Sequence, residues 1–144
     1  LYNFMKTIMA ENQAFAGTIK SFDYRGSRVY NGTNSFSEQH ISWLNNDYTF
    51  GCITGVTTSQ EATLVTELYD WERYNYMYML MNTIDPNEKN AKGKNTTQTI
   101  TVTFNDYYTN AYVYQNGART SVELTDGTYT VTLTAGQAVY VLPY

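Results

Sequence analysis

Strict alternation of apolar and polar residues dominates the last third of the chain, residues 97–142. The apolar members are Ile100, Val102, Phe104, Tyr129, Val131 and Leu133, and threonines occupy the positions between them. A period of two places one set on the buried face of a β-strand and the other set in water. The region therefore predicts a meander of about four or five short antiparallel strands, with threonine covering the outer face.

Pairs that contain glycine separate these predicted strands. Asn116-Gly117 lies between two alternating runs and supplies the two positive-φ residues that a type I′ hairpin needs. Asp126-Gly127 and Ala135-Gly136 mark the next two junctions. The pairs predict tight connections between successive strands.

A second pair of strands is predicted over residues 62–69 and 74–84. Both runs are apolar on both faces, which is typical of strands that lie between a sheet partner and another layer. Residues 70–73 connect them as a short hairpin loop, and Asp85-Pro86 ends the second strand because proline cannot donate to the ladder. Residues 48–56 also hold a candidate strand.

The N-terminal segment follows a helical pattern instead. Its apolar positions recur at spacings of three and four, with Asn12 in the same stripe, and they are Leu1, Met5, Ile8, Phe15 and Ile19. An amphipathic helix is predicted from about residue 2 to residue 15 or 16, ended by Gly17. We expect its stripe to pack against the sheet. In a longer parent chain it would equally serve as the last helix of a preceding domain.

Together these elements predict a mainly β protein, an antiparallel two-layer β-sandwich with one N-terminal α-helix. We divide the chain into the helix, residues 1–20, and the sandwich domain, residues 21–144. Residues 31–37 and 87–95 predict loops, and 36–44 fits either a short helical turn or a strand. The chain starts at Leu1 without an initiator methionine or a signal peptide, so we expect it to be part of a longer polypeptide.

Composition narrows the classes of function. A net charge of −4 argues against a nucleic-acid partner, which needs a basic face. Charged residues make up 15% of the chain, below the usual proportion of about 25%, and the chain contains 15 tyrosines. This balance is typical of extracellular β-proteins, so we expect an extracellular or cell-surface location. The sequence predicts no membrane span, because no stretch approaches the required run of about 20 apolar residues.

Catalytic and metal-binding signatures are weak. Cys52 is the only cysteine and His40 the only histidine, so we assign no metal site, no cofactor and no internal disulfide. Ser37, Glu38 and His40 lie too close along one segment to converge as a triad. The carboxylates considered for acid–base work are Asp23, Glu38, Asp47, Glu61, Glu67, Asp70 and Glu72. We expect most of them to be solvated surface charges, and we assign no catalytic residue.

Several strand and turn motifs resemble the C-terminal end of bacterial TIM-barrel glycoside hydrolases. They are, in order, residues 21–26, 78–86, 100–104, 113–117, 124–129 and 133–144. In that family the last barrel helix leads into an antiparallel β-sandwich, and the catalytic carboxylates lie upstream in the barrel. The chain departs from the usual Gly-Glu-Gly before the last strand, where it has Gly136-Gln137-Ala138. The resemblance implies an accessory domain whose partner is a preceding catalytic domain of the same polypeptide.

The candidate binding residues lie around the first predicted hairpin. Aromatic planes stack on the apolar faces of sugar rings, and neighbouring carboxylates or guanidinium groups bond the hydroxyls. The candidate glycan-binding residues are Asp70, Trp71, Arg73, Tyr74 and Tyr76. The alternative is that Trp71 and Tyr74 form a cross-strand pair that covers the sheet. The other aromatic candidates are Trp43, Tyr107 and Tyr108.

These observations lead to three hypotheses. The first is an accessory, non-catalytic β-sandwich of a secreted or surface glycoside hydrolase, which buttresses the catalytic barrel and contacts polysaccharide. The second is a stand-alone carbohydrate-binding module or surface adhesin domain. The third is a small enzyme in its own right.

Overall fold

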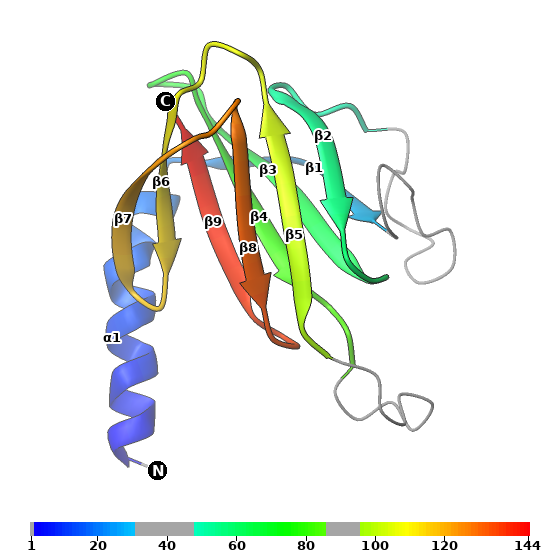
Figure 1. Ribbon diagram of the computed structural model, residues 1–144. Coiled ribbons are helices and arrows are strands. Elements are labelled where there is room, and N and C mark those ends of the chain that lie inside the picture. The colour runs from blue at the N-terminus through cyan, green and yellow to red at the C-terminus, as the bar shows by residue number, and fades with distance from the viewer. Residues whose placement is uncertain (1, 31–47, 86–95) are drawn as a thin grey trace.

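The structure is a computed structural model that describes residues 2–30, 48–85 and 96–144. The described residues form one helix and nine strands, in two antiparallel sheets arranged as a sandwich (Figure 1). The elements are α1 (Tyr2–Ile19), β1 (Asp23–Tyr30), β2 (Ile53–Thr58), β3 (Thr63–Asp70), β4 (Asn75–Asn82), β5 (Gln98–Phe104), β6 (Asn110–Gln115), β7 (Ala118–Glu123), β8 (Thr128–Leu133) and β9 (Ala138–Pro143). The predicted fold class is confirmed.

The strands of the predicted meander divide between the two sheets. The large sheet has the order β1-β3-β4-β9-β6-β7, and the small sheet has the order β2-β5-β8. Of the five strands in residues 97–142, β5 and β8 therefore belong to the small sheet, whereas β6, β7 and β9 belong to the large one. Alternation identifies a strand and its buried face. It does not identify the pairing partner, so the single meander is a wrong prediction.

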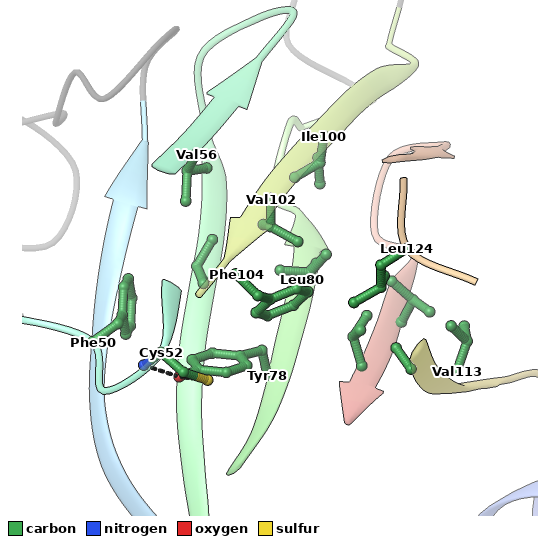
Figure 2. Close-up of a cluster of buried hydrophobic side chains, with 14 of the residues drawn as sticks. Phe50, Cys52, Val56, Tyr78, Leu80, Ile100, Val102, Phe104, Val113 and Leu124 are labelled. Atoms are coloured by element: carbon green, nitrogen blue, oxygen red, sulfur yellow. Dashed lines mark hydrogen bonds between the residues drawn. The ribbon is translucent and has the colours of Figure 1, made fainter. Parts of the chain in front are cut away.

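The core lies between the two sheets and is apolar throughout its centre. Val65, Leu80 and Val139 of the large sheet are fully buried, and so are Ile100 and Val102 of the small sheet. Figure 2 shows Tyr78 and Leu80 on one side of this cluster, with Val56, Ile100 and Val102 on the other. The residues predicted from alternation to face the core do so.

The outer face of the small sheet is covered by threonine, as predicted. Three cross-strand pairs join β5 to β8 through hydroxyl contacts: Thr99–Thr132 at 3.1 Å, Thr101–Thr130 at 2.9 Å and Thr103–Thr128 at 3.5 Å. Such pairs satisfy the hydroxyl groups on a half-solvated face.

The predicted tight turns are also confirmed. Asn116 and Gly117 connect β6 to β7 with φ values of 51° and 73°, the two positive values that a type I′ hairpin requires. Asp126 and Gly127 have φ values of 50° and 68° before β8. Short polar residues and glycine tolerate this left-handed conformation.

The helix is longer than predicted and packs only in part. It continues through Gly17 to Ile19, because a single glycine does not end a helix without a left-handed turn after it. The ring of Phe15 lies 4.3 Å from that of Tyr140, between centroids. Met5 and Met9 are 50% and 66% exposed, so the stripe does not cover the sheet along its whole length. In Figure 1 the N-terminal half of α1 extends past the ends of the strands.

Some predictions fall outside the described residues. These are the loops at 31–37 and 87–95 and the segment 36–44. The candidates Ser37, Glu38, His40, Trp43 and Asp47 also lie there. The strand predicted within 48–56 is found later, as β2 over Ile53–Thr58.

Candidate functional site at the hairpin end of the sandwich

The turn between β3 and β4 consists of residues 71–74, one position later than predicted, because Asp70 is the last residue of β3. The Asp70 carboxylate accepts hydrogen bonds from the backbone N–H groups of Glu72 and Arg73 at 2.9 and 3.1 Å. It also accepts bonds from the Arg73 guanidinium at 2.9 Å and the Ser21 hydroxyl at 3.0 Å. Asp70 is buried, and it holds the turn together.

The charge state of Asp70 follows from these contacts. Burial by itself raises the pKa of a carboxyl group, but the hydrogen bonds from Arg73, Ser21 and Glu72 outweigh it. The pKa of Asp70 is therefore lowered from 3.8. The Asp70 hydrogen bond in turn raises the pKa of Arg73. Arg73 remains 62% exposed while its Nη1 atom pairs with Asp70.

Trp71 is the first residue of the turn, and 55% of its surface is exposed. The guanidinium carbon of Arg25 lies 4.9 Å from the centroid of the indole. Tyr69 meets the indole edge-on, with 4.8 Å between ring centroids. Trp71 thus packs on Tyr69 of the preceding strand and does not form the alternative cross-strand pair with Tyr74. Its orientation is set before any ligand arrives.

Tyr74 stands apart from the other candidates. It is 76% exposed, and its φ of 58° places it in the left-handed region, which few non-glycine residues adopt. A bulky residue in this conformation carries a conformational cost of about 1 kcal/mol or more. This costly conformation occurs at the last residue of the turn, directly before β4.

Tyr76 points in another direction, toward the inner face of the large sheet. Its ring lies 4.7 Å from Tyr69 and 6.3 Å from Tyr78, in both cases between centroids. It also fills the space beside Gly51, where a Cβ atom would collide with the tyrosine ring. The five predicted candidates therefore do not form one surface.

A buried carboxylate, that of Glu67, lies beside these tyrosines. Glu67 is 1% exposed and accepts hydrogen bonds from the Tyr48 hydroxyl at 2.6 Å and the Tyr78 hydroxyl at 2.7 Å. A third bond, at 2.6 Å, comes from the backbone N–H of Gly51. The expectation of a solvated surface charge is wrong for Glu67 and for Asp70. A surrounding of hydrogen-bond donors makes such burial tolerable, and a strand pattern does not reveal it.

The network continues to the single cysteine. The hydroxyl oxygen of Tyr78 accepts a 3.1 Å hydrogen bond from the Cys52 backbone N–H and lies 3.0 Å from the Cys52 sulfur (Figure 2). Burial raises the pKa of the Cys52 thiol to about 11 and also raises the pKa of Tyr78. The network joins the segment before β2 to the large sheet, and we interpret it as structural.

In the described part of the chain, clefts adjoin the large sheet at two places, and neither of these clefts is lined by Glu67 or Cys52. The larger, with a volume of about 780 Å³, lies between the C-terminal end of α1, the 71–74 turn and strands β6, β7 and β9. Asp70, Trp71 and Arg73 line it, whereas Tyr74 and Tyr76 do not. The smaller cleft, of about 330 Å³, lies between Phe15 of α1 and the β6–β7 hairpin.

Sequence reasoning missed the part of the larger cleft that lies across the sheet from the turn. Tyr112 and Arg119 lie there, with the guanidinium carbon of Arg119 4.7 Å from the Tyr112 ring centroid. Alternation does place Tyr112 and Tyr114 on one face of β6, opposite the buried Ala111 and Val113. Their proximity to Trp71 follows only from the pairing of β9 with both β4 and β6.

Comparison of the chain with protein-family models, curated proteins and solved structures finds no match. Within the described ranges no helix has the length and apolar character needed to cross a membrane. Residues 2–30, 48–85 and 96–144 contain no group of three or more histidine, cysteine or acidic side chains arranged to hold a metal ion.

Proposed function

We propose that this chain is an accessory, non-catalytic β-sandwich of a bacterial carbohydrate-active enzyme, a glycoside hydrolase, and that α1 connects it to a preceding catalytic domain. The enzyme acts outside the cell or at the cell surface. The low charge content and the threonine-covered outer sheet support this location.

The exposed face of α1 is the observation that carries the proposal. The helix has 18 residues, yet Met5 and Met9 remain 50% and 66% exposed. Among the helix side chains that the structure describes, the ring contacts with the sandwich come from Phe15, near the C-terminal end of α1. Helices are stabilised mainly by the packing of their apolar face. A second body that packs on Met5 and Met9 explains why these positions are apolar.

The buried carboxylates support a non-catalytic role. A raised-pKa acid and a second free carboxylate are needed to cleave a glycosidic bond. Glu67 and Asp70 are both occupied by hydrogen bonds that hold the fold, and Asp70 has a lowered pKa. The chemistry therefore belongs to the preceding domain.

The test uses the complete reading frame, expressed with whatever precedes residue 1. We expect it to encode a barrel with paired catalytic glutamates. Met9→Glu is expected to leave the stability of the 144-residue chain unchanged, because the side chain is already in water. The same substitution is expected to lower the melting temperature of the full-length enzyme by several degrees, and Ala10→Glu, on an exposed position of α1 away from the face of Met5 and Met9, serves as its control.

Two results would contradict the proposal. One is a full-length frame without a catalytic domain before the helix. The other is a full-length protein whose melting temperature is equally insensitive to Met9→Glu and Ala10→Glu.

A second candidate function is carbohydrate binding by the sandwich itself. The specific observation in its favour is Trp71, which is more than half exposed and yet fixed by Arg25 and Tyr69. A fixed aromatic plane loses little conformational entropy when a sugar ring stacks on it. Calorimetry with soluble oligosaccharides, described below, tests this candidate.

A further inference from the structure

We propose that the larger cleft is a binding site for a neutral oligosaccharide chain, which lies across the outer face of the large sheet. The proposal rests on the carbohydrate-binding part of the proposed function. It extends the site from the 71–74 turn to a second strand hairpin that the sequence did not connect with it.

The dimensions of the cleft suit an extended ligand. Its volume of about 780 Å³ falls within the range of ligand sites, about 300–1,000 Å³. Between Asn75 on β4 and Arg119 on β7 it crosses four strands that are neighbours in the sheet, β4, β9, β6 and β7. Three inter-strand steps of about 4.8 Å give a length of about 14 Å. A short oligosaccharide fills such a length, whereas a single small metabolite does not.

Apolar and aromatic side chains form one part of the cleft lining, beside its charged and polar side chains. Leu142 of β9 is paired with Tyr112 of β6, and both lie on the outer face of the sheet. Trp71 borders the cleft at the β4 side, whereas Arg25 does not line it. Arg25 and Tyr69 contact part of the indole, and the 55% of the Trp71 side chain that stays exposed is the part that a sugar ring would meet.

Each end of the cleft carries a guanidinium group that is already held in place. Arg73 is fixed by its 2.9 Å ion pair with Asp70 and is 62% exposed. Arg119, which is exposed on β7, is stacked on Tyr112 at 4.7 Å. A planar guanidinium with several N–H donors suits the adjacent hydroxyl groups of a sugar. Its partial immobilisation before binding lowers the entropic cost of these hydrogen bonds.

The charges that line the cleft favour a neutral ligand. Three cationic and three acidic side chains line it: Lys20, Arg73, Arg119, Asp23, Asp70 and Glu72. Their formal sum is zero, so the cleft offers no net attraction to a uronate or a sulfated sugar. The hydroxyl groups of a neutral sugar, in contrast, can hydrogen-bond both to the cationic donors and to the carboxylate acceptors of the cleft.

The experiment is isothermal titration calorimetry of the 144-residue chain with cellohexaose, xylohexaose, mannohexaose and, as an acidic probe, hexagalacturonic acid. We expect at least one neutral hexasaccharide to bind. Trp71→Ala and Arg119→Ala are each expected to weaken that binding by about tenfold or more. Two controls, Tyr107→Ala and Thr120→Ala, are expected to leave it unchanged, because both residues are exposed and neither lines the cleft. Far-UV circular dichroism establishes that every variant is folded.

Three outcomes would overturn the cleft proposal. Binding of hexagalacturonic acid alone would contradict a neutral ligand. If none of the probes binds, the cleft is not a binding site for these sugars. Binding that depends on Trp71 but not on Arg119 confines recognition to the turn, which leaves the second candidate function standing without the cleft. None of these outcomes changes the Met9→Glu result in the full-length enzyme, so the two proposals fail separately.

Discussion

Glu67 on β3 accepts a 2.7 Å hydrogen bond from the hydroxyl of Tyr78, its direct partner on β4, and both side chains are buried. The Tyr78 hydroxyl oxygen accepts a further bond from the backbone of Cys52. The Glu67 carboxylate therefore accepts hydrogen bonds from three donors. Through Tyr78 it is also connected to Cys52, at the start of the small sheet. Burial of this charge is tolerable only while these partners remain in place.

Replacement of Glu67 by alanine is expected to lower the free energy of unfolding by about 3–5 kcal/mol. The buried Tyr78 hydroxyl loses its acceptor away from water, and the Tyr48 hydroxyl and the Gly51 N–H lose theirs at partly buried positions. Equilibrium unfolding in urea measures the change. Glu123→Ala, on an exposed position of β7, is the control and is expected to stay within about 0.5 kcal/mol of the parent.

Glu67→Gln separates charge from shape at the same position. The amide keeps the volume and one acceptor oxygen, but its NH₂ group cannot accept the hydrogen bonds that converge on the second oxygen. A loss of about 1–3 kcal/mol is expected. Equal stability of Glu67→Gln and the parent protein would show that the network does not need the charge.

Ionisation of Asp70 makes the stability of the fold depend on pH in the acid range. Its pKa is lowered from 3.8 in the folded state, so its ionised form stabilises the protein above about pH 4. That contribution is lost as the pH falls through the folded-state pKa. Asp70→Asn is therefore expected to be less stable than the parent at pH 7, and the difference is expected to shrink steadily below pH 3.8.

Urea midpoints measured from pH 7 to pH 2 check this expectation. Glu72→Gln removes an exposed carboxylate from the same turn and is expected to stay within about 0.5 kcal/mol of the parent at pH 7. A stability difference between Asp70→Asn and the parent that stays constant down to pH 2 would contradict the role assigned to the ionised Asp70.

The fold was largely predictable because its signals are local. Alternation at Ile100, Val102 and Phe104 predicted the buried face, and Asn116-Gly117 predicted the hairpin turn. Sheet membership was not predictable, because β4 pairs with β9 across more than fifty residues of sequence. Pairing between distant strands depends on packing that no local pattern encodes.

The candidate site was predictable only in part, for the same reason. The exposed Trp71 followed from its place in a predicted turn between two buried strands. The hydrogen bonds to Asp70 and the burial of Glu67 depend on partners that are far away in the sequence, such as Ser21 and Tyr48. The cleft toward Arg119 requires the strand order of the large sheet, which the sequence did not provide.

Tyr74 is expected to reduce stability through its backbone conformation. Because its φ is 58° and its side chain is 76% exposed, Tyr74→Gly removes the steric cost and loses little packing. A gain of about 0.5–1 kcal/mol is expected after the greater flexibility of glycine in the unfolded chain is included. Glu72→Gly in the same turn is expected to lose up to about 1 kcal/mol, since Glu72 does not have a positive φ.

Gly51 and Gly17 form a matched pair for a test of packing. A Cβ atom at Gly51 would collide with the ring of Tyr76, whereas a Cβ atom at Gly17 would meet nothing within 4 Å. Gly51→Ala is expected to cost about 1–3 kcal/mol. Gly17→Ala, in helical conformation, is expected to be neutral or to stabilise α1 by up to about 1 kcal/mol. Helix content and urea midpoints distinguish the two effects, and similar losses at both sites would contradict the packing of Tyr76 on Gly51.

Cys52 is expected to be chemically inert in the folded protein. The thiol is buried, and its pKa is raised to about 11, so the reactive thiolate is scarce at pH 8. Ellman's reagent is expected to react with the native protein only at the rate of unfolding, and rapidly in concentrated urea. Fast labelling of the native protein would show that the segment around Cys52 opens without global unfolding.

The raised pKa of the Cys52 thiol also predicts that the folded protein loses stability at alkaline pH. In the unfolded chain the thiol ionises near pH 9.0, but in the folded protein it stays neutral until about pH 11. The unfolded state therefore binds fewer protons between these values, and stability falls as the pH rises from 9 to 11, by up to about 2–3 kcal/mol. Cys52→Ser replaces the thiol with a hydroxyl, which can also hydrogen-bond Tyr78 but does not titrate in this range. The stability of this variant is therefore expected to fall less steeply over the same interval. If the two proteins lose stability in parallel from pH 9 to 11, the alkaline loss must come from tyrosines such as Tyr48, whose pKa is raised to about 12 by burial, and the burial of Cys52 makes no measurable contribution.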